Sequence, residues 1–328
     1  MRRTLPIAML LALLLTACAT PRGSPPPGAS FSGIAPLVRG AHESSWLVVM
    51  DAKDARSERL LVARWGVATG TSARWESVTV ADWSPVARQG FGVGRGGTRP
   101  PMDLESVCRL PGDTLRFLAA ESGQAMGGQG RLFDLELRRG PFGGWRARVL
   151  AVHSLPQGAD TSASNYEGLA CIGAGGEDVL LLLAERGGSR LHPRASLRRG
   201  ILNGARDRID WSDASGVEQV AALDQWPLGA EGLRGVADLT IRADGSLWAV
   251  STQDPGDDGP FRSWIYALGR VAPENSTTGW LPASRPAVAV RLDGEKAEGL
   301  TFTSDGRLVF VTDNEKLGGG IGVAAITP

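Results

Sequence analysis

The sequence has no surplus of charge of either sign, because 35 basic and 35 acidic residues cancel across its 328 positions. A protein that holds nucleic acid by electrostatic attraction needs a basic surplus, so that class is excluded. Apolar residues are not scarce, at 42% of the chain, and this excludes a wholly disordered protein. The length predicts one large folded domain or two ordinary ones.

Long apolar runs are also absent. The run from Leu5 to Leu15 is too short to cross a membrane, which takes about 20 apolar residues. Two arginines precede this run and Leu-Thr-Ala-Cys follows it, a pattern typical of a secretory signal peptide. These four residues resemble the bacterial lipobox, which implies that Cys18 is lipidated and becomes the first mature residue. An ordinary signal peptide with an incidental cysteine remains the alternative.

The expected lipid anchor sets the domain plan. A signal peptide is expected over residues 1–17, the lipidated cysteine and a Pro-rich linker over 18–30, and a single domain over 31–328. By the sorting rule of such lipoproteins, the non-acidic Ala19 implies the bacterial outer membrane, with the domain facing the periplasm or the cell surface. We expect a monomer that contacts the membrane through this anchor only.

Histidine motifs and nucleotide-binding motifs are missing too. The three histidines share no metal-ligand spacing and no G-x-S-x-G motif is present, which argues against a zinc enzyme and a serine hydrolase of that type. Residues 92–97 spell G-x-G-x-x-G, but no strand–helix unit encloses them, so they are predicted to form a loop.

What the sequence does contain is an internal repeat. Residues 298–315 align without a gap on 237–254, and further copies are found at 105–121, 167–185 and, more weakly, 32–51. Each copy is typical of a strand, a Gly/Asp turn and a second strand, and no segment has a sustained helical period. Strand-rich repeats of this length predict an all-β fold, a β-propeller. Five copies are visible and residues 187–235 could hold another, so we predict five or six blades, with six preferred.

Cys108 and Cys171 remain after removal of the signal peptide, and an exported protein can join such a pair. The repeat alignment places them one position out of step, so they should leave opposite sides of their strands. We therefore predict two small buried residues rather than a disulfide.

In a propeller the first strand of each blade lines the central channel and the second strand runs back beside it. The start of the first strand and the end of the second thus meet at one end of the channel, which we call the axial mouth. The aligned starts are Ser32, Glu105, Glu167, Ala237 and Glu298, and the aligned ends are Ala52, Glu121, Glu185, Gln253 and Asn314, with Asp51, Asp254, Asp313 and Glu315 beside them. Several carboxylates are therefore expected to converge about one axis.

Such a group of like charges is costly unless something offsets it, and three arrangements are open. The carboxylates bind a hard cation, for which oxygen ligands without histidine or cysteine favour Ca²⁺ over Zn²⁺. Alternatively they pair with Arg64, Arg131 or Arg186 and tie the blades together. In the third arrangement the glutamates accept backbone N–H bonds where one blade meets the next, which is a structural role.

The pattern resembles the phytase-like propeller family, described as having the esterase-like activity of phytase, and a related family of bacterial propeller domains of unknown function. The segments that carry the resemblance are 165–169 with 182–186, 297–300 with 310–314, and 103–107 with 120–121. The resemblance spans about residues 31–328. It implies an envelope propeller with a divalent cation, and with Glu105, Glu167, Glu298 and Asp313 as the carboxylates that bind it. The chain departs from the family at Ala237, and its three lysines weaken a phosphate clamp unless arginine substitutes.

Together these features predict a Ca²⁺-assisted hydrolase of phosphoric or carboxylic esters. The cation would polarise the substrate oxygen and activate water, and Glu167 would act as general base. Further ligand contacts are expected at Glu105, Glu121, Glu185, Arg186 and Asn314. The alternative is a non-catalytic binding or envelope-scaffold lipoprotein whose propeller face holds a protein or glycan partner.

Overall fold

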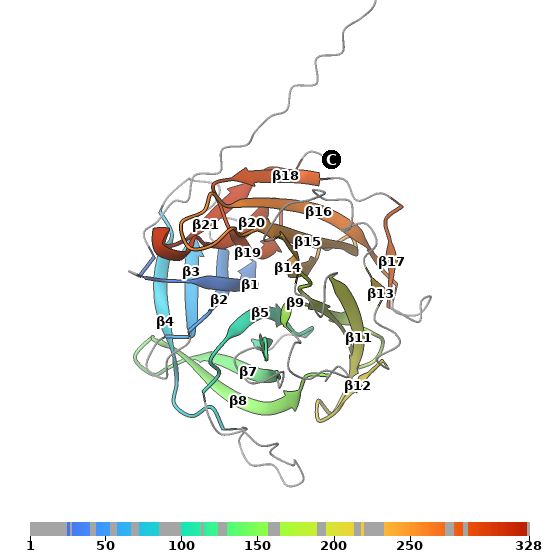
Figure 1. The fold of residues 1–328 in the computed structure, drawn as a ribbon. Coiled ribbons are helices and arrows are strands. Elements are labelled where there is room, and N and C mark those ends of the chain that lie inside the picture. Colours follow the sequence, from blue (N-terminus) through green and yellow to red (C-terminus); the bar gives the residue numbers. More distant parts are fainter. Residues whose placement is uncertain are drawn as a thin grey trace, which may run out of the picture.

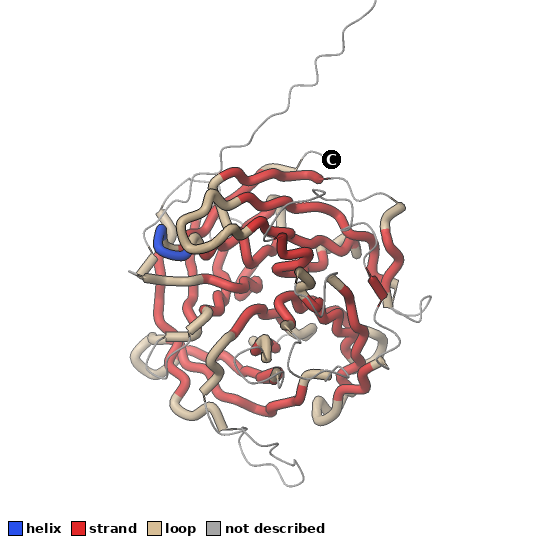
Figure 2. The backbone as a smooth tube through the Cα atoms, viewed as in Figure 1, coloured by secondary structure: helices blue, strands red, loops and turns tan. Residues whose placement is uncertain are grey.

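A computed structural model of the chain describes residues 25–26, 28–39, 44–52, 58–66, 72–84, 100–112, 115–123, 130–156, 165–188, 195–212, 218–219, 233–272, 279–284 and 288–326. The predicted signal peptide and Cys18 lie outside these ranges. Within them the secondary structure is β-strand apart from one short 3-10 helix, η4 (Glu315–Leu317), as Figure 2 shows. No helix of this described part is long and apolar enough to cross a membrane.

Within each blade the paired strands are antiparallel (Figure 1). The first blade is β1 (Phe31–Arg39), β2 (Ser44–Met50), β3 (Leu60–Trp65) and β4 (Arg74–Val80), and the second is β5 (Leu104–Arg109), β6 (Arg116–Glu121), β7 (Arg131–Arg139) and β8 (Trp145–Ser154). The third is β9 (Tyr166–Gly173), β10 (Val179–Glu185), β11 (Ser196–Leu202), β12 (Ile209–Trp211) and β13 (Glu218–Gln219). The fourth is β14 (Leu233–Ile241), β15 (Ser246–Gln253), β16 (Arg262–Val271), β17 (Trp280–Pro282) and β18 (Val288–Asp293), and the fifth is β19 (Ala297–Phe302), β20 (Leu308–Asp313) and β21 (Gly319–Ala324).

The first strands of the blades close a ring. β1, β5, β9, β14 and β19 contact one another in that order, and β19 returns to contact β1 (Figure 1). The predicted β-propeller is therefore confirmed. Residues 187–235 were expected to hold a possible sixth blade. In the described part of this stretch the strands β11, β12 and β13 belong to the third blade, and no additional inner strand is found there.

Position in the blade decides the sequence pattern of each strand. β10 is a second strand, enclosed by blades on both faces, and all seven of its residues, VLLLLAE, are buried. β8 is an outer strand with one face toward solvent, so buried and exposed residues alternate along it. β8 also pairs in parallel with β4, which joins the first two blades into one continuous sheet.

An irregularity of register recurs near the start of every inner strand. The register shifts bracket Ser32 in β1, Glu105 in β5, Glu167 in β9 and Glu298 in β19. In β14 the shift is longer and lies between Arg234 and Asp238. Such bulges re-aim a side chain next to a site. The bulge, repeated at the aligned position, is what turns these residues toward the axial mouth.

Glycine follows the bulge where neighbouring inner strands nearly touch. A Cβ added to Gly299 would lie 2.8 Å from the Cα of Gly33, and one added to Gly33 would lie 2.8 Å from the Cα of Ser106. No side chain fits into such a space. The Glu-Gly-Leu pattern of the repeat therefore combines a re-aimed carboxylate with a close contact between blades.

The two cysteines are joined. Cys108 of β5 and Cys171 of β9 form a disulfide with a Cα–Cα distance of 5.9 Å, so the prediction of two unpaired residues is wrong. Neighbouring blades pack face to face, so a side chain from one side of an inner strand meets a side chain from the other side of the next. Cys108 packs against Leu169 and Leu181, whereas Val107 packs toward the first blade. The one-position offset between Cys108 and Cys171 in the repeat alignment is therefore what allows the disulfide to form.

Candidate functional site: the axial mouth

The register of the blades brings the predicted carboxylates to one end of the channel. Leu104 pairs with Glu121, Tyr166 with Glu185, and Ala297 with Thr312, so each inner strand begins where its partner ends. Glu105, Glu167 and Glu298 are close enough for their charges to act on one another. The expected convergence about one axis is therefore present, but the mouth is divided into two unlike halves.

Cations neutralise the half formed by the third, fourth and fifth blades. Arg234 binds Glu298 at 2.8 Å and Asp254 at 2.5 Å, and its Nη1 lies 3.8 Å from Glu167. Arg186 donates to the same Oε1 of Glu167 at 2.7 Å, and the amide of Asn165 donates to it at 3.1 Å. Glu167 thus has several donors around one oxygen. We call these residues, with Lys296 and its partners, the compensated half.

Lys296 completes that half as a buried ammonium group, with only 2% of its side chain exposed. Its Nζ lies 3.2 Å from Glu298, 3.4 Å from Asp313 and 3.5 Å from Asp254, and it also binds Glu315. Burial disfavours the charge, yet the carboxylates of Glu298 and Asp313 raise the pKa of Lys296 above its usual value. A buried cation of this kind holds like charges together at the axis.

A second set of polar side chains accepts hydrogen bonds from the backbone of the blades. Glu121 accepts the N–H of Met102 at 2.9 Å, Glu185 that of Asn165 at 2.8 Å, and Asn314 that of Lys296 at 2.8 Å. Each therefore ties the end of a second strand to the residue that leads into the first strand of the same blade. Glu121 is also held by two hydrogen bonds from Arg131, at 2.6 and 2.8 Å. The part of these residues in ligand binding stays a prediction.

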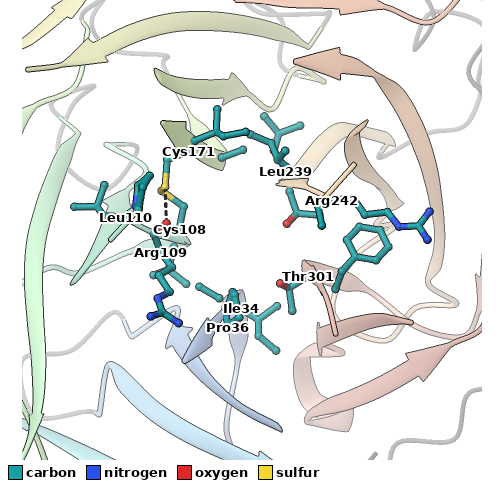
Figure 3. A pocket seen from close by; sticks show the side chains of 18 of the residues that line it. Ile34, Pro36, Cys108, Arg109, Leu110, Cys171, Leu239, Arg242 and Thr301 are labelled. Carbon is teal, nitrogen blue, oxygen red and sulfur yellow. Dashed lines mark hydrogen bonds between the residues drawn. A yellow bond between two sulfur atoms is a disulfide. The ribbon is translucent and has the colours of Figure 1, made fainter. Parts of the chain in front are cut away.

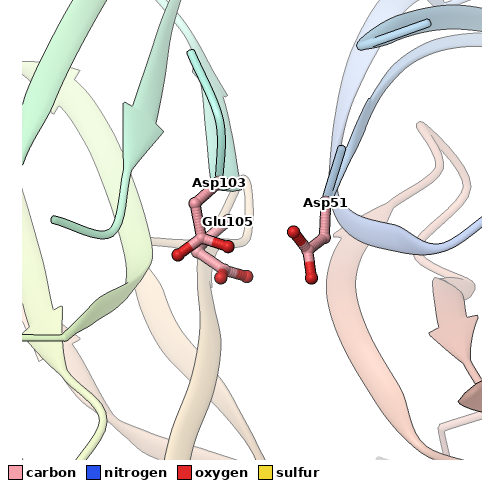
Figure 4. Close-up of side chains that lie close together, drawn as sticks. All are labelled: Asp51, Asp103 and Glu105. Carbon is pink, nitrogen blue, oxygen red and sulfur yellow. The ribbon is translucent and has the colours of Figure 1, made fainter. Parts of the chain in front are cut away.

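The half formed by the first two blades carries a cluster of three acids. One carboxylate oxygen from each of Asp51, Asp103 and Glu105 lies within 4.8 Å of the others. Asp103 and Glu105 project together from β5 and its approach, and Asp51 faces them from the end of β2 (Figure 4). Asp103 is buried and accepts a hydrogen bond from Ser122, whereas Asp51 and Glu105 are partly exposed. We call these three residues the acidic triad.

Glu105 belongs to the acidic triad, and its pKa is affected by burial and by the neighbouring charges. Loss of hydration raises its pKa well above the usual range, and the charges of Asp103, Glu167 and Asp51 raise it further. No arginine or lysine of the described residues forms an ion pair with it. The surroundings of Glu105 therefore raise its pKa and favour its protonated form. By contrast, loss of hydration raises the pKa of Glu298 to about 7, while Arg234 and Lys296 counteract the rise.

Two of the three arrangements left open by the sequence are found, arginine pairing and backbone hydrogen bonding, while binding of a cation stays a prediction. Arginine pairing holds Glu121 and Glu167, backbone bonds hold Glu121 and Glu185, and Glu105 lies in the acidic triad with no ion pair of its own among the described residues. Three of the four expected cation ligands, Glu167, Glu298 and Asp313, are paired with cations. Arg64, also expected at the mouth, pairs with Glu76 instead.

Sequence reasoning missed Arg234 and Lys296. Lys296 immediately precedes β19 and Arg234 is the second residue of β14, but neither aligns with a basic residue in the other copies. The one available signal was the rarity of lysine, since a lysine placed two residues before a repeated glutamate is unusual in this chain. Asp238, one place after the missing acid at Ala237, is buried and accepts the N–H of Leu300 at 2.8 Å, so it joins the fourth and fifth blades.

The other end of the channel is a vestibule of about 850 Å³ (Figure 3). It is lined by the far ends of the inner strands, with Ile34, Leu110, Leu239 and the Cys108–Cys171 disulfide in its wall. Arg109 donates to the carbonyl of Leu37 at 2.9 Å, and Arg242 lies 3.7 Å from Asp244. Glu105 and Glu298, the two glutamates described above with raised pKa values, therefore lie at the mouth and not in the vestibule.

Comparison with known proteins supports the fold only. No protein-family model matches the chain, and no curated protein matches it. Among solved structures, the endo-arabinase of Bacteroides thetaiotaomicron superposes with a TM-score of 0.53 and 12% identity, covering 94% of this chain and 98% of that one.

Weaker likenesses include an exo-1,5-alpha-L-arabinanase from a bovine ruminal metagenomic library (TM-score 0.46, 12% identity, covering 90% and 92% of the two chains). Another is the GH43_1 enzyme of Xanthomonas citri complexed with xylotriose (TM-score 0.44, 11% identity, 94% and 90%). At these identities the likeness establishes architecture and no more. The chain is a β-propeller.

Proposed function

We propose that the protein is a hydrolase of glycosidic bonds whose active site is the acidic triad of the axial mouth. The observation that carries this proposal is the Glu105 carboxyl, with its raised pKa, held beside Asp51 and Asp103. Two neighbouring carboxyl groups in opposite protonation states are what acid–base cleavage of a glycosidic bond needs.

The roles follow from position. Glu105 is partly exposed and protonated, so it donates its proton to the leaving oxygen. Asp51 faces it from the neighbouring blade and serves as the carboxylate that stabilises the sugar cation or attacks it (Figure 4). One oxygen of Asp51 and one of Glu105 lie within 4.8 Å of each other, close enough for both groups to act on the same glycosidic bond. Asp103, held by Ser122, raises the pKa of Glu105.

The compensated half supplies the surroundings. Ion pairs keep Glu167 and Glu298 in place, and their cations are Arg186, Arg234 and Lys296. These cations also offset part of the negative charge of the mouth. The arabinan-cleaving neighbour named above adds support for a polysaccharide as the substrate class. In this proposal Glu167, expected from the sequence as general base, is a positioning residue.

A second candidate, the phytase-like Ca²⁺-assisted ester hydrolase expected from the sequence, is favoured by one observation. Three carboxylates offer oxygens within 4.8 Å of one another, and an all-oxygen set suits Ca²⁺. The acidic triad is therefore the cation site of this candidate in place of the original set, of which Glu167, Glu298 and Asp313 are paired with arginine or lysine. Bound Ca²⁺ would polarise a substrate oxygen, and Asp51, Asp103 and Glu105 would hold it in ionised form.

One assay separates these candidates. The purified protein is incubated with a panel of polysaccharides, nitrophenyl esters and phosphate esters, each with Ca²⁺ or with a chelator. The glycosidase proposal predicts reducing ends in either condition and a loss of about 100-fold or more in Glu105→Gln. Asp293→Asn, an exposed carboxylate paired with Arg262, is the control and should keep full activity.

The remaining outcomes decide between the alternatives. Ester cleavage that requires Ca²⁺ would replace the first candidate by the second. Saturable Ca²⁺ or glycan binding by calorimetry, without turnover, would support the non-catalytic binding lipoprotein. Absence of both turnover and binding would contradict every catalytic role assigned to the mouth.

We also propose that the chain is anchored in the bacterial outer membrane through Cys18, which lies outside the described residues. The support is the lipobox-like Leu-Thr-Ala-Cys sequence after a short apolar run. Cys18→Ser should move the protein from the membrane fraction to the soluble fraction in cell fractionation. If Cys18→Ser still sediments with the membrane fraction, lipid anchoring is contradicted as the only tether.

A further inference from the structure

The β7–β8 hairpin ends in a basic tip far from the axial mouth. Residues 137–148, which we call the hairpin tip, contain four arginines and no acidic residue. β7 begins beside the mouth, where Arg131 pairs with Glu121, and runs to Arg139. The tip therefore projects from the opposite end of the second blade.

A fully exposed aromatic ring occupies the apex. Phe142 is 96% exposed, and its neighbours Pro141 and Gly143 are exposed as well. The turn is closed by backbone bonds, from Gly140 to Gly144 at 2.7 Å and from Gly143 to Gly140 at 3.0 Å, and Arg139 also donates to the carbonyl of Gly143. A polar residue would serve this turn equally well. Folding gains nothing from the ring, so any burial of it must come from another surface.

The arginines around the apex are incompletely neutralised. Arg138 and Arg146 stand directly opposite each other on β7 and β8, an arrangement that is unfavourable for like charges. Glu136 pairs with Arg138 at 2.5 Å and Arg148 at 2.8 Å, and these two side chains are still 53% and 46% exposed. Arg146 is exposed and has no acidic partner within the described ranges.

Arg139 occupies the other face of the hairpin. It binds Glu76 of β4 at 2.8 Å, and its guanidinium lies 4.0 Å from the centre of the Trp145 ring. Arginine is therefore present on both faces of a hairpin whose apex is aromatic. Guanidinium groups match phosphate oxygens in geometry as well as charge.

We propose that the hairpin tip docks on an anionic lipid bilayer, with Phe142 inserted at the level of the headgroups and the arginines bound to lipid phosphates. An aromatic apex within a basic surround is the composition that favours the interface of such membranes. Docking in this way turns the axial mouth away from the bilayer and leaves it open to solvent. The proposal depends neither on the glycosidase nor on the lipid anchor.

Vesicle binding tests the proposal. The full chain, carrying Cys18→Ser throughout so that no acyl chain contributes, is sedimented with vesicles of phosphatidylglycerol and phosphatidylcholine or of phosphatidylcholine alone. We expect binding to the anionic vesicles only, weakened by salt. Arg146→Ser should lower the partition coefficient about fivefold and Phe142→Ser about tenfold. Leu317→Ser removes another exposed apolar side chain, 72% exposed at the mouth end, and should change nothing.

A probe at the apex gives a second reading that does not depend on the rest of the chain. Phe142→Cys, labelled with an environment-sensitive dye, should shift its emission to the blue on anionic vesicles, while the same label at Leu317→Cys should not. Equal shifts at both positions, equal binding to neutral vesicles, or no shift at position 142 would each overturn the proposal. If the hairpin tip binds an envelope protein instead of lipid, the label at position 142 should show no shift on vesicles.

Discussion

Glu105 and Glu167 occupy the same place in two successive blades, yet their surroundings give them different chemistry. Arg186 and Asn165 crowd around one oxygen of Glu167, at 2.7 and 3.1 Å. Glu105 faces Asp51 and Asp103 instead, and its pKa rises because of lost hydration and then because of those charges. A repeated residue can thus serve the fold in one blade and carry a proton in the next.

Glu185 provides a test of pH dependence at this scale. Loss of hydration, and to a smaller extent the charge of Glu167, raises its pKa to about 8, although N–H bonds from Asn165 and Gly187 oppose the rise. Its unfolded pKa is near 4.5, so the folded state loses stability as the pH rises from about 4.5 to 8. Glu185→Gln removes this loss, and its stability relative to the wild type should be higher at pH 9 than at pH 5 by at least about 1 kcal/mol.

Urea unfolding of both proteins at the two pH values measures this difference. The control is Glu177→Gln, which replaces an exposed carboxyl of the same blade. An identical effect of Glu185→Gln at pH 5 and pH 9 would show that Glu185 is ionised in the folded state throughout this range.

The inner strand is the element that positions the site. Its bulge turns one residue into the axial mouth, and the glycine after the bulge lets the next blade come close, as at Gly33 and Gly299. In β9 and β19 glycine follows the re-aimed glutamate, whereas Ser106 follows Glu105 in β5. In β9 and β19 the mouth carboxylate and the blade contact are therefore produced by the same pair of residues.

Gly299→Ala should consequently destabilise the protein by about 1–3 kcal/mol, because the new methyl group would have to displace the backbone of Gly33. Gly173→Ala is the matched control, since a Cβ there meets nothing within 4 Å in another inner strand. Thermal unfolding compares the two variants. Equal stability of both would mean that neighbouring inner strands do not approach as closely as described.

The repeat in the sequence was sufficient to predict the propeller and the convergence of Glu105, Glu167 and Glu298, because register follows from where each copy begins. The division of the mouth could not be predicted in this way. It depends on Arg234 and Lys296, which have no counterparts in the other copies and reach across blade boundaries. The disulfide was missed for a related reason, since contacts between blades join opposite sides of successive strands.

At the scale of the whole molecule, a chain without net charge separates its functions along one axis. The axial mouth gathers carboxylates with unequal protonation, and the other end carries the vestibule and the basic hairpin tip. Balance of total charge therefore excluded a nucleic-acid binder without revealing this polarity. An acidic mouth directed away from an anionic surface would keep that site accessible to a soluble polymer.

The most direct test of the central claim, that Glu105 supplies the proton at a hydrolytic site in the axial mouth, is the pH dependence of reducing-end release from the polysaccharide panel. Wild-type protein should remain active at pH values at which an ordinary carboxyl has lost its proton, because the pKa of Glu105 is raised. Glu105→Gln should lose about 100-fold or more at every pH, while Asp293→Asn matches the wild type. An unchanged rate in Glu105→Gln, or no release from any polysaccharide, would contradict the claim.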